Sequence, residues 1–195
     1  MKDIFKYVLD NFSLFYNGDT SLVSYGKDPQ KVHISQSMPE AFFDRNKDID
    51  ADQVVWRSWK DRKIPFFFGM DESRDIISEK DGQVTVNADI IASAFYFLSG
   101  WNEQFAEKDE LSRVRYDKSM MADLGIIDVP VVNYYFDILK TAIEKVAPVS
   151  KRTLWGDNNM ALVLTHDIDT CQSGWLEDSF YSLKKARILS VAKLM

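Results

Sequence analysis

One feature restricts the fold of this chain more than any other, namely an uninterrupted apolar run, Met160-Ala161-Leu162-Val163-Leu164-Thr165. Such a run lacks the alternation of apolar and polar positions, which is typical of a strand covered on both faces in a parallel sheet. Residues 180–194 combine apolar and basic positions and are expected to form a helix. Strand, loop and helix are the first half of a βα unit, and no later strand follows. We therefore expect the C-terminal part to be the beginning of a sheet domain whose remainder is missing.

Three segments upstream have apolar residues at helical spacing, which predicts helices at residues 4–12, 88–99 and 130–148. Asn87 is expected to cap the second helix and Gly100 to end it. Pro130 is expected to open the third helix, because proline is tolerated in a first helical turn.

Short runs rich in β-branched and aromatic residues predict strands at 22–25, 32–35, 54–56, 64–68, 75–78 and 84–86. Asp81-Gly82 lies between the last two runs and predicts a hairpin; because more than two residues separate these runs, the turn type stays open. Pro65 places its strand at a sheet edge or makes it a strand start. The polar segments 39–53 and 103–121 are expected to be mainly surface loops. These elements predict an α/β fold, with α+β as the alternative, built on a mixed sheet with helices.

A polar segment over residues 150–159 separates this region from the apolar run. It contains Lys151-Arg152 and Gly156-Asp157-Asn158-Asn159, and such a composition is typical of a domain boundary. We expect an N-terminal domain at 1–150 and a second, incomplete one at 151–195.

Composition excludes several classes of function. The net charge of −6 argues against nucleic-acid binding, which needs a basic face. The single cysteine, Cys171, excludes an internal disulfide, and two histidines are too few for a histidine-rich metal centre. We find no signal peptide and no uncharged apolar stretch long enough to span a membrane, so a cytoplasmic location is expected.

An acidic pair directly follows the apolar run, in Thr165-His166-Asp167-Ile168-Asp169-Thr170. Two carboxylates at the end of a buried strand repel one another and lose solvation. A divalent cation removes this cost, with one aspartate as a ligand and the other free to act as a base. The alternative is structural: Asp167 or Asp169 closes an Asx turn or caps a helix, and His166 is simply hydrogen-bonded.

Three protein families use an acidic pair of this kind. Glycosyltransferases hold a metal-bound nucleotide diphosphate with Asp-x-Asp, which is a short motif. Haloacid-dehalogenase-type phosphatases use Asp-x-Asp-x-Thr, but here Thr170 comes one place early and Cys171 takes the expected position. Polysaccharide deacetylases (carbohydrate esterase family 4 type) have an apolar strand that ends in Thr-Phe-Asp-Asp or Thr-x-Asp-x-Asp. Residues 161–169 resemble the second form.

The resemblance continues upstream, since a subset of these deacetylases carries a long N-terminal domain. Residues 89–99, Trp101-Asn102-Glu103 and residues 130–134 are similar to hallmarks of that domain and occur in the expected order. Such proteins usually have arginine before the aromatic–acid pair, where this chain has Gly100. The resemblance extends from Ile64 to the C-terminal end.

The resemblance implies that Asp167 is the general base and Asp169 a metal ligand. A divalent metal, zinc or similar, would hold the water that attacks the acetamide group of an N-acetylated sugar in a polysaccharide. The family's His-x-x-x-His motif comes later, and no histidine follows His166 here. Because catalytic zinc takes three protein ligands, the chain alone is expected to bind no metal and to be inactive. It would contain the accessory domain followed by the first strand and helix of an incomplete (β/α) barrel.

A second interpretation is a non-catalytic accessory module that binds a glycan or a protein. Trp101 with Glu103 would then be a sugar-stacking platform, although a tryptophan at a helix end more often covers the core. Trp56 and Trp59 lie among basic residues and either form an aromatic–basic surface or belong to a half-buried strand whose charged side is solvated. An unpaired strand and an apolar helix face would also be able to join two copies into a homodimer.

Overall fold

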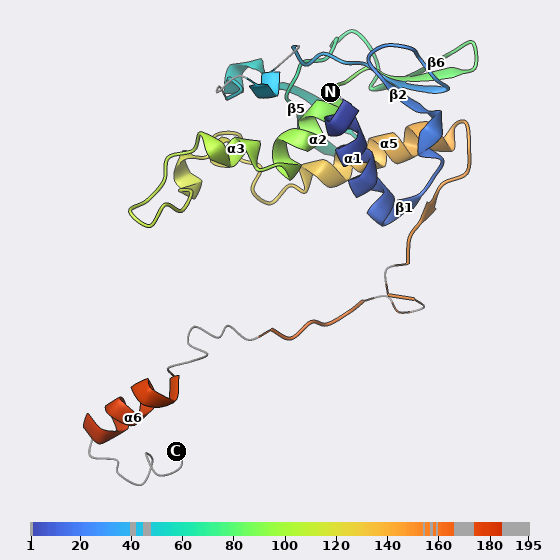
Figure 1. The fold of residues 1–195 in the computed structure, drawn as a ribbon. Helices are drawn as coiled ribbons and strands as arrows, with labels where there is room; N and C mark the ends of the chain where they lie inside the picture. The colour runs from blue at the N-terminus through green and yellow to red at the C-terminus, as the bar shows by residue number, and fades with distance from the viewer. Residues whose placement is uncertain are drawn as a thin grey trace. The chain divides into compact units, whose positions relative to one another are not determined.

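The computed structural model describes residues 2–39, 42–44, 48–153, 155–156, 158, 160–165 and 174–184 (Figure 1). The chain divides into two compact units, Met1–Leu154 and Trp155–Met195. Helices and a mixed sheet make up the first unit, as the sequence predicts, and the described residues form no closed barrel. The predicted domain boundary at residue 150 lies close to the division between the units.

A four-stranded sheet in the order β2-β3-β7-β6 forms one layer of the first unit. It consists of β2 (Val23–Tyr25), β3 (Val32–Ile34), β6 (Ile77–Lys80) and β7 (Gln83–Val86). The first three strands in this order are parallel, and β6 is antiparallel to β7. In β3 and β7, buried valine and isoleucine alternate with half-buried His33 and Thr85, so one face of the sheet packs on the core.

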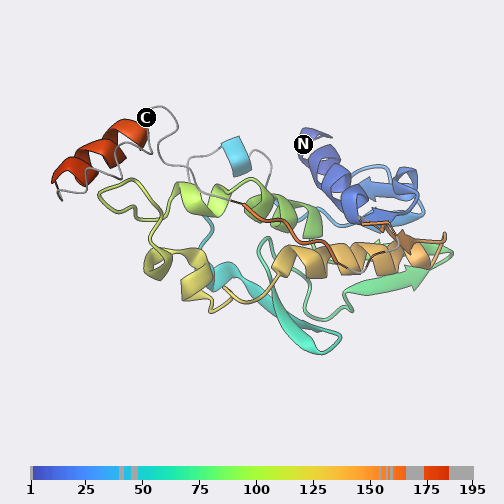
Figure 2. The ribbon, with the colours of Figure 1, turned by 90° about the horizontal axis from the view of Figure 1, so that it is seen from below.

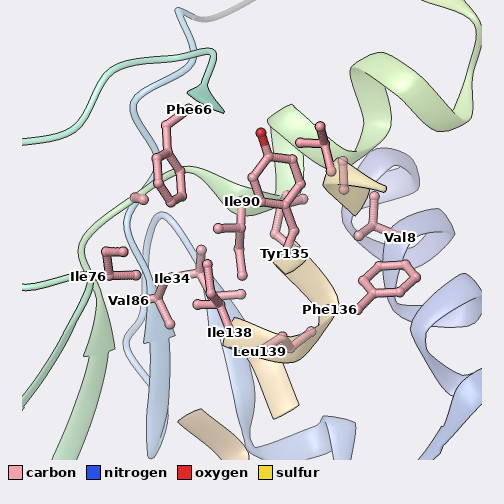
Figure 3. Packing of buried hydrophobic residues seen from close by; sticks show 14 of the residues in the cluster. Val8, Ile34, Phe66, Ile76, Val86, Ile90, Tyr135, Phe136, Ile138 and Leu139 are labelled. Carbon is pink, nitrogen blue, oxygen red and sulfur yellow. The ribbon is translucent and has the colours of Figure 1, made fainter. Parts of the chain in front are cut away.

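Three helices pack on the sheet and on each other. They are α1 (Lys2–Phe15), α2 (Ile90–Leu98) and α5 (Val131–Glu144); α2 contacts both of the others and α5 contacts β7. Figure 3 shows the resulting core, where Ile138 and Leu139 of α5 approach Ile34 and Val86 of the sheet. All four side chains are buried, so the apolar stripe of α5 holds the helix on the sheet.

A separate hairpin of β4 (Val55–Trp59) and β5 (Arg62–Phe66) lies beside α5 (Figure 2). The Tyr135 hydroxyl of α5 donates a hydrogen bond to the Pro65 carbonyl oxygen, and the Phe66 and Tyr135 rings are 5.7 Å apart. The Trp59 indole N–H donates to Asp137, which also pairs with Lys60. Pro65 thus lies in a two-stranded sheet, where both strands are edges, as its sequence predicts.

The hairpin predicted around Asp81-Gly82 is confirmed, but the predicted separation of more than two residues is wrong, because β6 extends to Lys80 and β7 begins at Gln83. Lys80 pairs with Gln83, and both turn residues have positive φ, +52° at Asp81 and +76° at Gly82. Positive φ at both positions defines a type I′ turn, whose twist matches that of the flanking strands.

The predicted cap of the second helix is wrong by two residues. Asp89 caps α2, since its carboxylate accepts a hydrogen bond from the Ala92 N–H. The Asn87 amide instead donates to the Asp75 carbonyl and to Ser78. The predicted helix end is confirmed, because Gly100 has φ +69°.

Short elements complete the first unit. They are β1 (Tyr16–Asn17), paired with β8 (Ser150–Lys151), the helices α3 (Trp101–Gln104) and α4 (Met120–Asp123), and 3-10 turns at Thr20–Leu22, Phe42–Asp44, Ala51–Gln53 and Tyr116–Lys118. Residues 103–121 are mostly loop, as expected. Segment 39–53 is not only a surface excursion, because Ile49 is buried and Phe42 and Phe43 pack against the core.

The predicted strand at residues 160–165 does not form. These residues are exposed and have no strand partner among the described residues, with Leu162 and Leu164 about 80% exposed. A strand needs a neighbour to satisfy its backbone N–H and C=O groups, which explains the difference. Helix α6 (Gly174–Lys184) begins before the predicted start at Phe180, and residues 185–194 of the predicted helix lie outside the described residues.

Candidate functional site

The acidic pair predicted to carry the chemistry, Asp167 and Asp169, lies outside the described residues. The roles of general base and metal ligand therefore stay predictions. Within the part of the chain that the structure describes, no group of three or more His, Cys, Asp or Glu side chains is placed to hold a metal ion.

Trp101 and Glu103, the predicted sugar platform, have different surroundings. The Trp101 ring lies 5.1 Å from the Phe43 ring and 5.5 Å from that of Phe105, whereas Glu103 is exposed. The Trp101 Nε1 is buried and has no hydrogen-bond partner among the described residues. The structure thus favours the interpretation in which Trp101 covers the core.

A partly open pocket of about 230 Å³ adjoins this group of aromatic side chains. We call it the aromatic pocket; its lining residues are Ser37, Pro39, Phe42, Ile49, Gln53, Phe67, Phe68 and Gly69. The Phe42 and Phe68 rings are 5.0 Å apart and nearly perpendicular, at 82°. None of the described lining side chains is charged, which favours an uncharged ligand.

The aromatic pocket is built where β5 ends. Phe67, Phe68 and Gly69 directly follow this strand, and Gly69 has φ +81°, a conformation that favours glycine. The Phe67 ring stacks on Tyr96 of α2, with ring centres 5.2 Å apart. The turn after β5 therefore directs two phenylalanines to the pocket while α2 supports one of them.

The loop that carries Ser37 is fixed by the buried carboxylate of Asp89. The backbone N–H groups of Ser37 and Met38 each donate to Asp89 Oδ2 over 2.9 Å, and so does the Tyr25 hydroxyl. Burial raises the pKa of Asp89 although these bonds and that from Ala92 act to lower it. Asp89 thus joins the start of α2, strand β2 and one wall of the pocket.

Another wall is held by a bond between Tyr96 and Asp48. The Tyr96 hydroxyl donates to Asp48 Oδ1 over 2.7 Å, and the same oxygen accepts the N–H of Ile49, a lining residue. Burial raises the pKa of the Tyr96 hydroxyl above its ordinary value, with the neighbouring Asp48 adding to the effect. Tyr96 therefore stays a neutral donor at physiological pH.

A second pocket, of about 180 Å³, lies at the start of α5. Its lining is apolar apart from Asn133 and includes Phe97, Met121, Ile126 and Val129. It offers fewer side-chain polar groups than the aromatic pocket, which we regard as the better candidate site.

Sequence reasoning missed both the aromatic pocket and the role of Asp89. Phe42-Phe43, in an otherwise polar segment, could have indicated the pocket. Two adjacent aromatic side chains are usually at least partly buried, which would have predicted a contact between this segment and the core. Asp89 lies three residues before Ala92, the spacing of a helix cap, but Asn87 offers an equally acceptable side chain.

The first unit is thus an α/β domain with a small pocket whose described lining side chains are uncharged. Residues 4–148 match a family described as "Family of unknown function (DUF7033)", and the chain belongs to this family. No curated protein and no solved structure matches the chain. Among the described residues, no helix combines the length and apolar character that crossing a membrane requires.

Proposed function

We propose that residues 4–148 are the accessory domain of a polysaccharide deacetylase and that Thr165–Asp169 belongs to its catalytic part. The domain would bind the glycan, while Asp167 and Asp169 would serve as base and metal ligand. The observation that carries this proposal is the division of the chain. The hydrophobic core of the first unit consists of residues that precede Trp155. The apolar run that leads to the acidic pair belongs to the second unit and is exposed.

The residues of this chain do not fit a complete zinc site. Asp169 supplies one ligand, His166 is the last histidine of the sequence, and catalytic zinc takes three protein ligands. A complete site would take its remaining ligands from residues that this sequence does not contain. An exposed apolar run supports the same view, because it needs further strands to cover it.

The reading frame beyond the codon for Met195 tests the proposal. We expect it to continue and to encode a His-x-x-x-His motif, which supplies the missing ligands. A frame that closes directly after Met195 would contradict the deacetylase proposal. It would favour the second candidate, a non-catalytic glycan- or protein-binding module, which the uncharged aromatic pocket also supports.

A further inference from the structure

We propose that the aromatic pocket binds a single neutral sugar ring. The inference rests on the proposed function for the choice of an N-acetylated glycan, but the chemistry of the ligand follows from the pocket itself. Its walls are three phenylalanine rings, Phe42, Phe67 and Phe68, and its polar side chains are Ser37 and Gln53.

The polar groups of the pocket select an uncharged ligand that has hydroxyl or amide groups. Ser37 and Gln53 are both exposed, and the Ser37 hydroxyl and the Gln53 amide can each donate and accept a hydrogen bond. A carboxylate or an ammonium group would lose solvation there without meeting an opposite charge on the described lining residues. A purely apolar ligand that covered the Ser37 hydroxyl, which is exposed in the free protein, would displace its water without replacing the hydrogen bond.

The aromatic walls suit the faces of a sugar ring. A pyranose has apolar C–H faces and a rim of polar groups, so it can pack on phenylalanine while its rim reaches Ser37 and Gln53. The perpendicular rings of Phe42 and Phe68 form a corner that contacts both a face and an edge of such a ligand. The pocket volume of about 230 Å³ is below the roughly 300–1,000 Å³ typical of drug-sized ligands, so one ring fits rather than a chain of rings.

The pocket is held in place before any ligand arrives. Asp89 fixes the backbone at Ser37, Tyr96 supports the Phe67 ring, and Asp48 fixes the backbone of Ile49. A site that is already ordered loses less conformational entropy on binding. This support separates the pocket from a chance hollow between mobile side chains.

Titration of the full chain with N-acetylchitotetraose in a calorimeter tests the proposal. We expect saturable binding that Phe68→Ala weakens about tenfold or more, because a stacking wall is lost. Gln53→Ala should weaken it roughly three- to tenfold, through one lost hydrogen bond. The matched controls are Phe15→Ala and Gln104→Ala, which alter side chains outside the pocket lining and should leave the affinity unchanged.

Absence of binding to the unaltered chain would overturn the proposal, as would equal affinity in Gln53→Ala and Gln104→Ala. Gln53 is exposed, so this comparison decides the matter even if Phe68→Ala fails to fold. Binding of hexanol with no binding of the tetrasaccharide would also overturn it, since the ligand would then be apolar. The reading frame beyond Met195 is independent of these results, so a failed pocket and a failed deacetylase proposal are distinguishable.

Discussion

Replacing Asp89 with alanine is expected to lower the free energy of unfolding by about 3–5 kcal/mol. The change removes the acceptor for the Tyr25 hydroxyl and for the N–H groups of Ser37, Met38 and Ala92. Asp89 is only 1% exposed, so water does not replace the lost bonds without local opening. Single domains are commonly stable by about 5–15 kcal/mol, and such a loss should be plain in urea unfolding followed by circular dichroism.

Asp19→Ala is the matched control for this substitution. Asp19 also caps a helical turn, accepting from the Ser21 N–H, but it lies near the surface. Its removal should cost about 0.5 kcal/mol, because water solvates the freed N–H. Equal losses in the two variants would show that Asp89 does not organise the fold as described.

Phe66→Ala is expected to lower the free energy of unfolding by about 3–5 kcal/mol, the range for truncating a buried phenylalanine. The Phe66 side chain is fully buried at the end of β5 and packs on Tyr135 (Figure 3). Its loss leaves a cavity where the β4–β5 hairpin meets α5. Because Phe67 and Phe68 follow directly, the same variant should weaken binding in the aromatic pocket.

Phe15→Ala provides the control for lost aromatic surface. The Phe15 ring is 42% exposed and lies 6.3 Å from that of Phe136. We expect the free energy of unfolding to fall by less than about 1 kcal/mol, because the Phe15 side chain buries little apolar area. A loss in Phe66→Ala as small as that in Phe15→Ala would contradict the packing of the hairpin on α5.

Local signals in the sequence were sufficient for most elements of the first unit. Asp81-Gly82 predicted a hairpin because few residue pairs adopt positive φ at adjacent positions. Pro130 and the apolar spacing after it predicted α5, which begins at Val131. These features depend on neighbours in the chain, so tertiary contacts did not override them.

Pairings between distant segments were not predictable in the same way. Strands β2 and β3 are separated by only residues 26–31, yet they are parallel, whereas so short a connection usually joins antiparallel strands. The choice of Asp89 over Asn87 as the cap also depends on Tyr25 and the loop at Ser37, far away in sequence. The aromatic pocket combines segments after β3 and β5, so no local pattern contains it.

The strand predicted at residues 160–165 does not form, although its local sequence pattern favours one. Its composition fits a buried strand, but composition does not supply the neighbouring strands that complete its hydrogen bonds. The roles assigned to Asp167 and Asp169 rest on a resemblance and stay predictions.

Acetate release by the purified full chain tests the central claim most directly, namely that this chain binds a glycan but lacks a complete catalytic site. The chain is incubated with saturating N-acetylchitotetraose, with and without added zinc or cobalt, and acetate is followed over time. We expect binding without acetate above the level of a protein-free blank, because the sequence contains one proposed metal ligand, Asp169, and no histidine after His166. Metal-dependent acetate release beyond one equivalent per chain would contradict the account.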